Sequence, residues 1–416
     1  MDPAKRQTDE LTDLVRSIVA GERRLHDLPA ELTAEQAATV RRRAVEALRS
    51  SDLQHSGRYS LDAERAASRH CENFIGISQV PLGVAGPLSV RGQRVGPEET
   101  LYVPLATTEG ALIASVNRGC RAIAEAGGAV VRVEDVGMTR APVFRASGLE
   151  QSERFLGWLS DNEERIREVA EGTSRFLRLA EIKSQAIGTS IFVRFRFSSG
   201  DAMGMNMATI ACDRVVRELI EPETGVRCVA LSGNYCVDKK PSAINFLEGR
   251  GKRIHAEIEL GPEILEGCLK TSAEAMIEVQ YRKNLIGSIA AGAIGSNAHF
   301  ANVLAAFFIA TGQDVAQVVE GSMGMTTVER AGEGGVLASI FMPDVPLGVV
   351  GGGTVLSTQH EALALLGAEA KTGSPGAGSL RLAEILGATV LAGEISLMAA
   401  FTSGDLAGAH ERLGRG

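Results

Sequence analysis

The sequence predicts an α+β protein with more than one domain. Residues 11–19 and 33–48 carry apolar side chains at helical spacing, whereas residues 191–197 alternate as a half-buried strand does. Residues 285–312 form the longest apolar run and predict a buried core helix. At 416 residues the chain exceeds one ordinary core, so we expect two or three domains of about 150 residues each.

The composition is that of an ordinary globular protein. Hydrophobic residues make up 44% and charged residues 23% of the chain, which excludes a disordered chain. The formal net charge is -8 without any basic block, so we expect no nucleic-acid partner. The 47 glycines and 4% aromatic residues indicate many tight turns and close backbone approaches.

The cysteines and the ends of the chain indicate the compartment. The six cysteines are scattered without a CxxC pair or a partnered histidine, so we expect no metal site and no disulfide framework, and a cytoplasmic location fits. The charged N-terminus shows no signal segment. The run 285–312 is long enough to span a bilayer, but Asn297, His299 and Asn302 would each be costly in lipid, so we expect no membrane partner.

The first 70 residues predict a separate helical domain. Leu11, Leu14, Val15, Ile18 and Val19 follow helical spacing. A second helix is predicted to start at Thr33, with Gln36 completing a capping box. No residue of this segment suggests chemistry, so we interpret it as accessory.

The next segments contain the first candidate functional residues. Residues 71–92 are apolar sequence punctuated by glycine and proline, which predicts a loop flanked by short strands. In residues 107–122, Glu109 lies in a turn before a helix that carries Asn117 and Arg118. A glutamate in this position is most often only a partner of the helix dipole.

Residues 143–230 have a compact α+β pattern. Just before them, Arg140 is expected in a turn, where an arginine is usually a surface residue. Residues 150–180 predict a charged helix and its continuation, and residues 191–197 predict a strand. The strand leads through a turn at Asp201 into a helix, an arrangement that suits anion binding.

The sequence of that turn, GDAMGMNM, is not the GxGxxG fingerprint and does not indicate a Rossmann domain. Its methionines could equally fill a core.

Residues 232–246 form the most informative stretch. Asp238, Lys239 and Lys240 directly precede Pro241, which keeps Lys240 out of a helix and predicts an extended loop. Ammonium groups beside a carboxylate suit an anionic substrate or a developing oxyanion. The common alternative, two lysines on a solvated helix face, does not fit the proline.

The apolar run carries polar residues that need partners. His299 and Asn302 are i, i+3 neighbours on the predicted helix, where a satisfied core pair is the simplest interpretation. The helix is expected to end near residues 312–314, which places Asp314 where the helix dipole disfavours an anion. We therefore expect another group to compensate the charge of Asp314.

Two C-terminal features are weak when taken alone. Residues 348–354, GVVGGGT, precede a helical stretch and could let a backbone pass close to a ligand, or be only a flexible turn. His410 lies in a glycine-rich tail after a helix that ends near Gly404, where a histidine is usually solvated.

Taken together, these segments resemble a known family. The matching motifs are ENFIG at 72–76, TTEGALIAS at 107–115, GMTR at 137–140, DAMGMNM at 201–207, GNYCVDKKPSAINFLEGRGK at 233–252, SNAHFANVLAAFFIATGQDVAQ at 296–317, GGGT at 351–354 and AGEISLMAA at 392–400. In this order the chain resembles the 3-hydroxy-3-methylglutaryl-CoA (HMG-CoA) reductases, specifically the class I catalytic portion in its soluble prokaryotic form.

The resemblance implies reduction of HMG-CoA to mevalonate and coenzyme A with NADPH, the step that feeds isoprenoid synthesis. By position, Lys239 resembles the lysine that stabilises the oxyanion, and Glu109 the acid that protonates the aldehyde oxygen. Asp314 resembles the carboxylate linked to both, and His410 the histidine that protonates the coenzyme A thiolate.

The resemblance also implies the binding residues. The positions that match substrate contacts are Glu72, Asn117, Arg118, Arg140, Ser232, Asp238, Lys240, His299 and Asn302. The positions that match cofactor contacts are Ser174, Arg175, Phe176, Asp201, Met203, Gly204, Met205, Asn206, Met207, Gly351, Gly352, Gly353 and Thr354. Arg175 could pair with the 2′-phosphate that distinguishes NADPH from NADH, and no metal is implied.

The family fold is a large substrate domain around a long central helix, with an inserted ferredoxin-like domain that binds NADP. We therefore expect a helical domain at 1–70, the large domain at 71–141 and 231–416, and the inserted domain at 142–230. A homodimer or homotetramer is implied, with active sites at the subunit interface. Before the GGGT motif, Pro346 and Val349 depart from the acid and threonine of family members, and Ala409 replaces a serine.

Two other functions fit parts of the pattern. A coenzyme A-ester lyase or acyltransferase could use Lys239 and His410 without redox chemistry. A catalytically silent coenzyme A-binding protein would be expected to lack at least one of the four catalytic residues. Within the family, oxidation of mevalonate with NAD is the remaining alternative.

Overall fold

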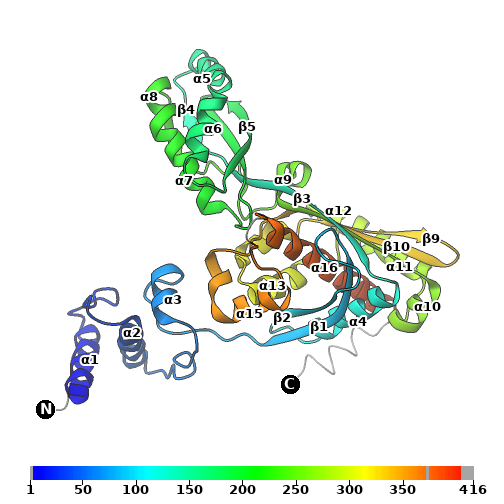
Figure 1. Ribbon diagram of the computed structural model, residues 1–416, viewed down its shortest axis with the longest axis horizontal. Helices are drawn as coiled ribbons and strands as arrows, with labels where there is room; N and C mark the ends of the chain where they lie inside the picture. Colours follow the sequence, from blue (N-terminus) through cyan, green and yellow to red (C-terminus); the bar gives the residue numbers. More distant parts are fainter. Residues whose placement is uncertain (1–2, 372–373, 404–416) are drawn as a thin grey trace. The chain divides into compact units, whose positions relative to one another are not determined.

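The protein is described here by a computed structural model that covers residues 3–371 and 374–403 (Figure 1). The chain forms two compact units. One consists of the described residues up to Pro81 together with Val355–Glu361, and the other of Leu82–Thr354 together with the described residues from Ala362 onward.

The first unit contains the predicted N-terminal helices, α1 (Pro3–Val19), α2 (Ala34–Arg49) and α3 (Ala63–Arg69). The capping box at the start of α2 is confirmed, because Thr33 Oγ1 accepts the N–H of Gln36 at 3.2 Å and Gln36 Oε1 accepts the N–H of Thr33 at 2.9 Å. Ile18, Val40 and Ala44 form a small core between α1 and α2.

The second unit is built on a mixed sheet that is mainly antiparallel. Its strands are β1 (Leu82–Arg91), β2 (Thr100–Ala106), β3 (Ala129–Arg140), β4 (Val143–Arg145), β5 (Arg178–Ile187), β6 (Ser190–Ser198), β7 (Arg227–Ala230), β8 (Arg250–Leu260), β9 (Met325–Ala331) and β10 (Gly335–Val345). Strands run in the order β7-β4-β6-β3-β8-β10-β9. Strand β1 pairs antiparallel with β2 and parallel with β3, and β5 pairs with β6.

The remaining helices are α4 (Leu112–Glu125), α5 (Leu149–Asp161), α6 (Glu163–Glu171), α7 (Met205–Val215), α8 (Glu221–Thr224), α9 (Ala243–Glu248), α10 (Pro262–Ile264), α11 (Ala273–Val279), α12 (Ser288–Ala290), α13 (Phe300–Thr311), α14 (Val318–Gly321), α15 (Ser357–Leu365) and α16 (Ala377–Ser403). Segments Val216–Ile220, Leu265–Leu269 and Gln280–Gly287 are π-helical, and Val315–Gln317 and Gly352–Val355 are short 3₁₀ turns. The predicted α+β class is confirmed.

The second unit contains two separate hydrophobic cores. The larger joins α4, α13 and α16 to β1–β3 and β8–β10. The smaller joins β4–β6 to α5–α7, and in it the side chains of the predicted strand, Ile191, Val193, Phe195 and Phe197, are fully buried. Strand alternation therefore predicted the buried face of β6 correctly.

The long helix α16, red in Figure 1, packs against α4, α13, β3 and β8. Its segment Ala377–Thr402 is the one helix of the described residues that is long and apolar enough to cross a membrane. However, 83% of its most apolar window is buried inside the protein, as expected of a core helix. At Gly119 of α4, an added Cβ would overlap the Ala392 carbonyl of α16, so the two helices approach closely.

Two predictions of helix extent are wrong. The run 285–312 is not one helix, because the chain leaves the helical conformation at Gly292 and Gly295, with φ of 70° and 96°, before α13 begins. Glycine adopts positive φ readily, so these two residues permit the break, and the expected single core helix does not form. The helix predicted at 150–180 ends at Glu171, and β5 follows it.

Candidate active site

The lysine loop, residues 232–242, opens on a cavity of about 660 Å³ that we call the lysine cavity. Its wall combines this loop with the end of β3, the start of α7, and the segments 312–314 and 348–354. The lining residues are Arg140, Ala202, Met203, Gly204, Met205, Asn206, Met207, Asp238, Lys239, Gly312, Gln313, Asp314, Gly348, Val350, Gly351, Gly352, Gly353 and Thr354.

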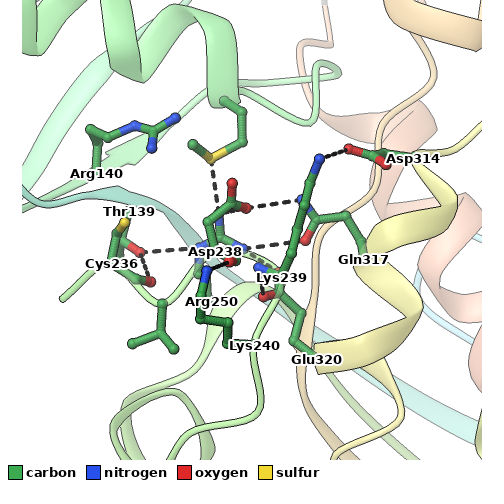
Figure 2. Close-up of polar contacts among 12 residues, drawn as sticks. Thr139, Arg140, Cys236, Asp238, Lys239, Lys240, Arg250, Asp314, Gln317 and Glu320 are labelled. Carbon is green, nitrogen blue, oxygen red and sulfur yellow. Dashed lines mark hydrogen bonds and ion pairs between the residues drawn. The ribbon is translucent and has the colours of Figure 1, made fainter. Parts of the chain in front are cut away.

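Lys239 and Asp314 form an ion pair in this cavity, with Lys239 Nζ 2.7 Å from Asp314 Oδ2 (Figure 2). The hydrogen bond to Asp314 raises the pKa of Lys239, although partial burial opposes the rise. Lys239 therefore remains an ammonium group at neutral pH. The loop is confirmed, but Lys239 itself lies in the left-handed region with φ of 59° rather than in an extended conformation.

The predicted position of Asp314 is only partly correct. Helix α13 ends at Thr311, and Asp314 is the N-cap of the next turn, where its Oδ1 accepts the N–H of Ala316 at 3.1 Å. An N-cap favours an anion, so the dipole of this turn stabilises the carboxylate. The expected compensating group is Lys239.

Asp238 is anchored beneath the loop. Its Oδ1 accepts from Arg250 Nη2 at 2.8 Å and from Gln317 Nε2 at 3.1 Å. Burial alone would raise the pKa of Asp238, but Arg250 and Gln317 outweigh it, so the pKa is lowered. Lys240 Nζ donates to the carbonyl of Asp238 at 3.1 Å, and Ser232 Oγ lies 3.6 Å from Cys236 Sγ.

Arg140 is the last residue of β3 and not part of a turn, so that prediction is wrong. The pairing of β3 with β6 extends to Arg140, which faces Phe195 across the ladder. Its Nε and Nη2 donate to Thr209 Oγ1 of α7 at 3.1 and 2.8 Å. Arg140 thus contributes a positive charge to the wall of the lysine cavity.

A second cavity of about 770 Å³, the glutamate cavity, contains Glu109, Arg118, His299 and Asn302. Asn302 Nδ2 donates to Glu109 Oε1 at 3.1 Å. His299 precedes α13 as its N-cap, and its N–H donates to Glu394 of α16. Its Nε2 is buried and finds no hydrogen-bond partner within the described part of the chain.

Two of the remaining substrate candidates, Asn117 and Arg118, lie on α4. Arg118 donates to Ser396 Oγ at 3.0 Å and to the Ser396 carbonyl at 2.5 Å, and Asn117 Oδ1 accepts the N–H of Gly86 at 3.0 Å. Arg118 therefore joins α4 to α16 at the edge of the glutamate cavity. Glu72 belongs to the N-terminal unit.

The wall of the lysine cavity formed by 202–207 and 348–354 suits a phosphate-bearing cofactor. Gly204 is the N-cap of α7 with φ of 101°, and no described side chain caps this helix, so its first N–H groups are available to an anion. Gly348 lies so close to the backbone of Met203 that a Cβ would overlap it. The glycines Gly351, Gly352 and Gly353 expose backbone to the cavity.

Three of the cofactor candidates have other contacts. Asp201 does not line the cavity but accepts the N–H groups of Gly376 and Ser379 at 3.0 Å, at the start of α16. Met205 is buried, and Met207 packs against the smaller core. The interpretation of the methionines as core residues is therefore correct in part.

The second cofactor segment, Ser174–Phe176, lies between α6 and β5 and does not line the lysine cavity. The Arg175 guanidinium lies 4.6 Å from the centre of the Phe176 ring, and Phe176 is half-exposed.

The structure brings Lys239, Asp314, Asp238 and Arg140 together, but places Glu109 with Asn302 and His299 in the other cavity. His410 lies outside the described residues. Within the residues described, no group of three or more histidine, cysteine, aspartate or glutamate side chains could hold a metal ion.

Sequence reasoning missed several polar residues beneath the lysine loop. Arg250, Gln317 and Glu320 are buried there, and Thr209 supports Arg140. One signal was available, because Arg250 stands between Gly249 and Gly251 within the lysine motif. Both glycines have positive φ, 75° and 70°, so the backbone takes an irregular path at the start of β8.

Comparison with solved structures identifies the fold. The chain resembles the class II 3-hydroxy-3-methylglutaryl-CoA reductase from Streptococcus pneumoniae bound to NADPH in open conformations, with a TM-score of 0.65 and 17% identity over 95% of this chain and 96% of that one. A further structure of the Streptococcus pneumoniae enzyme gives a TM-score of 0.65 at 16% identity, over 95% of this chain and 85% of that one.

Curated relatives are much more similar in sequence. The chain is 48% identical to 3-hydroxy-3-methylglutaryl-coenzyme A reductase of Methanothermobacter thermautotrophicus, over 97% of this chain and 100% of that protein. It is 45% identical to the Pyrococcus abyssi reductase, over 97% and 99% of the two chains. The Haloferax volcanii reductase is 47% identical over 97% and 98%.

Fold and relatives together define a reductase of a coenzyme A thioester. The sequence model of the hydroxymethylglutaryl-coenzyme A reductase family matches residues 37–415, and the chain belongs to this family. Its members are NADPH-dependent oxidoreductases, so the predicted enzyme class and cofactor are confirmed.

Proposed function

We propose that this chain reduces HMG-CoA to mevalonate and free coenzyme A, with Lys239 as the group that stabilises the oxyanion. The observation that carries the assignment of Lys239 is its ion pair with Asp314 in a cavity that also exposes the glycines of residues 351–353. A lysine whose pKa is raised keeps its proton at neutral pH, so it can donate a hydrogen bond to an oxygen as that oxygen becomes negative.

The reaction needs two hydrides and two protons, which convert the thioester carbonyl to an alcohol and release coenzyme A as its thiol. Bound NADPH supplies hydride. Lys239 stabilises the carbonyl oxygen, and Asp314 holds the ammonium group toward the cavity. Glu109 protonates that oxygen, and His410 protonates the departing thiolate. A histidine suits the last role because its usual pKa lies near neutrality.

Charges near the loop suit the anionic groups of the ligands. Arg140 and Lys240 would pair with the free carboxylate of HMG-CoA, beside Ser232 and Asp238. Asn302, which lines the glutamate cavity, is proposed as a further substrate contact. The uncapped start of α7, with Met203–Met207 and residues 351–354, would hold NADPH together with Asp201, which supports this wall. Ser174, Arg175 and Phe176 form a second contact, in which Arg175 would pair with the 2′-phosphate. The glutamate cavity, with Arg118 and His299, would face the remainder of HMG-CoA. Asn117 and Glu72 are proposed as further substrate contacts.

One active site requires Glu109 and Lys239 together, yet the two residues line different cavities of one chain. We therefore assign each active site to two copies, one contributing the glutamate cavity and the other the lysine loop. A homodimer or homotetramer follows from this assignment.

The division into domains follows the two cores of the larger unit. The smaller core supports an inserted NADP-binding domain at 142–230, within a large domain at 71–141 and 231–416 around α16, after a helical domain at 1–70. The identity of 48% with an archaeal relative, against 17% with a class II structure, supports class I. We place the enzyme in the cytoplasm, because the described cysteines are free thiols.

A coupled assay tests the reaction. Purified protein is mixed with HMG-CoA and NADPH, and both NADPH oxidation and thiol release are followed. We expect two NADPH oxidised for each thiol released, and a much slower reaction with NADH. Thiol release without NADPH oxidation would instead identify an acyltransferase or lyase, and faster oxidation of NADH would contradict the role of Arg175.

A further inference from the structure

Arg250 is a fully buried cation that contacts three of the segments around the lysine cavity, the end of β3, the lysine loop and the start of α7, and also Gln317 and Glu320 (Figure 2). It is the first residue of β8. Its donors reach Thr139 Oγ1 at 3.2 Å, Asp238 Oδ1 at 2.8 Å, Met205 Sδ at 2.8 Å, Gln317 Oε1 at 3.5 Å and Glu320 Oε1.

The partners of Arg250 adjoin residues already assigned to the site. Thr139 precedes Arg140, and Thr139 Oγ1 also donates to the carbonyl of Cys236 in the lysine loop at 3.1 Å. Asp238 precedes Lys239, and Met205 begins α7. A guanidinium has five N–H donors in a fixed plane, so one side chain can fix the relative positions of these segments.

Glu320 extends this arrangement to the backbone of Lys239. It is fully buried in α14, and its Oε2 accepts the N–H of Lys239 at 2.6 Å while Oε1 accepts from Arg250. Lys239 has φ of 59°, a left-handed conformation that costs a non-glycine residue conformational free energy. The bond from Glu320 offsets this cost at the residue whose side chain must reach Asp314.

We propose that Arg250 and Glu320 form a positioning pair that holds the lysine loop in its reactive conformation. This inference rests on the proposed role of Lys239 as the group that stabilises the oxyanion. Neither residue lines the cavity, so both act through the residues that they hold.

A role in stability alone is the competing explanation. Replacing a buried ion pair by apolar residues of similar size is often neutral for stability or even favourable, so such a replacement separates the two explanations. If the pair only stabilises the fold, an apolar pair should preserve activity. If it positions Lys239, activity should fall while the fold survives.

Two variants, one double and one single, test the proposal by comparison with the wild-type enzyme, with NADPH and HMG-CoA as substrates. The double variant Arg250→Met/Glu320→Met removes both charges. Glu320→Gln nearly preserves the shape of the side chain but leaves only one acceptor oxygen. In either orientation, the amide NH₂ group faces a donor, either Arg250 or the N–H of Lys239, so one of the two hydrogen bonds is lost. Each change should displace Lys239, and displacement of about 1 Å lowers kcat about a hundredfold.

Two further measurements distinguish positioning from damage to the fold. The KM for NADPH in Glu320→Gln should remain that of the wild type. The carboxylates that face Lys239 are Asp314, Asp238 and Glu320, and each of them raises the pKa of Lys239. Removing the charge of Glu320 should therefore shift the alkaline limb of the kcat profile to lower pH.

Lys252→Met is the matched control. Lys252 is another buried cation on β8, paired with Asp135 at 2.9 Å, and has no role in the proposed site. We expect some loss of stability but wild-type kcat. A folded double variant with wild-type kcat would overturn the proposal. Should the double variant not fold, Glu320→Gln decides, because an unchanged kcat and alkaline limb would overturn it equally. An inactive wild-type enzyme would instead refute the proposed function.

Discussion

Lys239 Nζ contacts Asp314 Oδ2 at 2.7 Å. Neither residue lies inside a regular helix or strand. Lys239 has a left-handed backbone, and Asp314 caps a 3₁₀ turn. The pair explains two separate features of the sequence, a lysine before a proline-containing loop and an aspartate after an apolar helix. It also fixes the direction in which the ammonium group points.

Lys239→Ala should abolish measurable turnover while leaving the protein folded. Removing one donor to an oxyanion costs about 10²–10³ in kcat, and removing a full charge should cost at least as much. The measurement is NADPH oxidation with HMG-CoA, alongside circular dichroism. Lys270→Ala is the matched control, because Lys270 also has φ of 59° but is an exposed helix cap that lines neither cavity. Wild-type turnover in Lys239→Ala would remove its assigned role.

Mixing two inactive variants tests whether the active site is shared between subunits. Lys239→Ala and Glu109→Gln should each be inactive alone. If the site combines Glu109 of one copy with Lys239 of another, a mixed dimer contains one intact site, and co-refolded protein should recover about a quarter of wild-type activity.

The readout is turnover after the variants are unfolded and refolded together. Lys239→Ala co-refolded with the double variant Lys239→Ala/Glu109→Gln is the control, since no mixed dimer then contains an intact site. If the informative mixture stays as inactive as this control, both residues act within one chain.

His410→Gln should slow the full reaction but leave the reduction of free mevaldehyde largely intact. Mevaldehyde carries no thiolate, so a residue that protonates thiolate has no function in that step. The two substrates are compared at the same NADPH concentration. Equal losses with both would contradict the assignment of His410.

How much of this structure can be predicted from the sequence depends on how far apart in the sequence the interacting residues lie. Local signals sufficed for the capping box at Thr33, for strand β6 and for the loop around Lys239. Each depends on neighbours within a few residues. The four candidate catalytic residues, by contrast, came from a resemblance to a family and not from local pattern.

The failures involve partners that are distant in the sequence. Residues 285–312 were predicted as one helix because they form the longest apolar run, and the sequence does not show the partners of their polar residues. In the structure, the chain breaks there, and Glu394 of α16 accepts the N–H groups of Ala298 and His299 at 2.8 and 2.7 Å. Arg250 was missed for the same reason, since its partners lie on four other segments. No local periodicity encodes such contacts.

Gly119→Ala should destabilise the larger core. The added methyl group would overlap the carbonyl oxygen of Ala392, so α4 and α16 must separate, and overpacking of this kind costs about 1–3 kcal/mol. Gly157→Ala is the control, since Gly157 is also inside a helix but an added Cβ meets no atom within 4 Å. That change should stabilise by about 0.5–1 kcal/mol. Unfolding in urea measures the free energy of unfolding of both variants. Equal changes in the two variants would contradict the close approach of α4 and α16.

Glu320 should make the stability of the wild-type protein depend on pH. Burial raises the pKa of Glu320 from 4.5 to about 7, although the Arg250 guanidinium opposes the rise. Between these two values the folded state binds more protons than the unfolded state, so the contribution of Glu320 to stability falls as pH rises. A shift of this size corresponds to a few kcal/mol, on the order of 1.4 kcal/mol for each pH unit.

Glu320→Gln carries no titratable group, so its unfolding free energy should fall less than that of the wild type between about pH 4.5 and 7. The pKa of Asp344 is raised by burial and by the charge of Glu320, so Glu320→Gln also lowers the pKa of Asp344, and both changes weaken the pH dependence in the same direction. Urea unfolding at several pH values across this window measures the difference. Parallel curves for the two proteins would show that Glu320 keeps an ordinary pKa, in which case its charge, paired with Arg250, persists throughout the window.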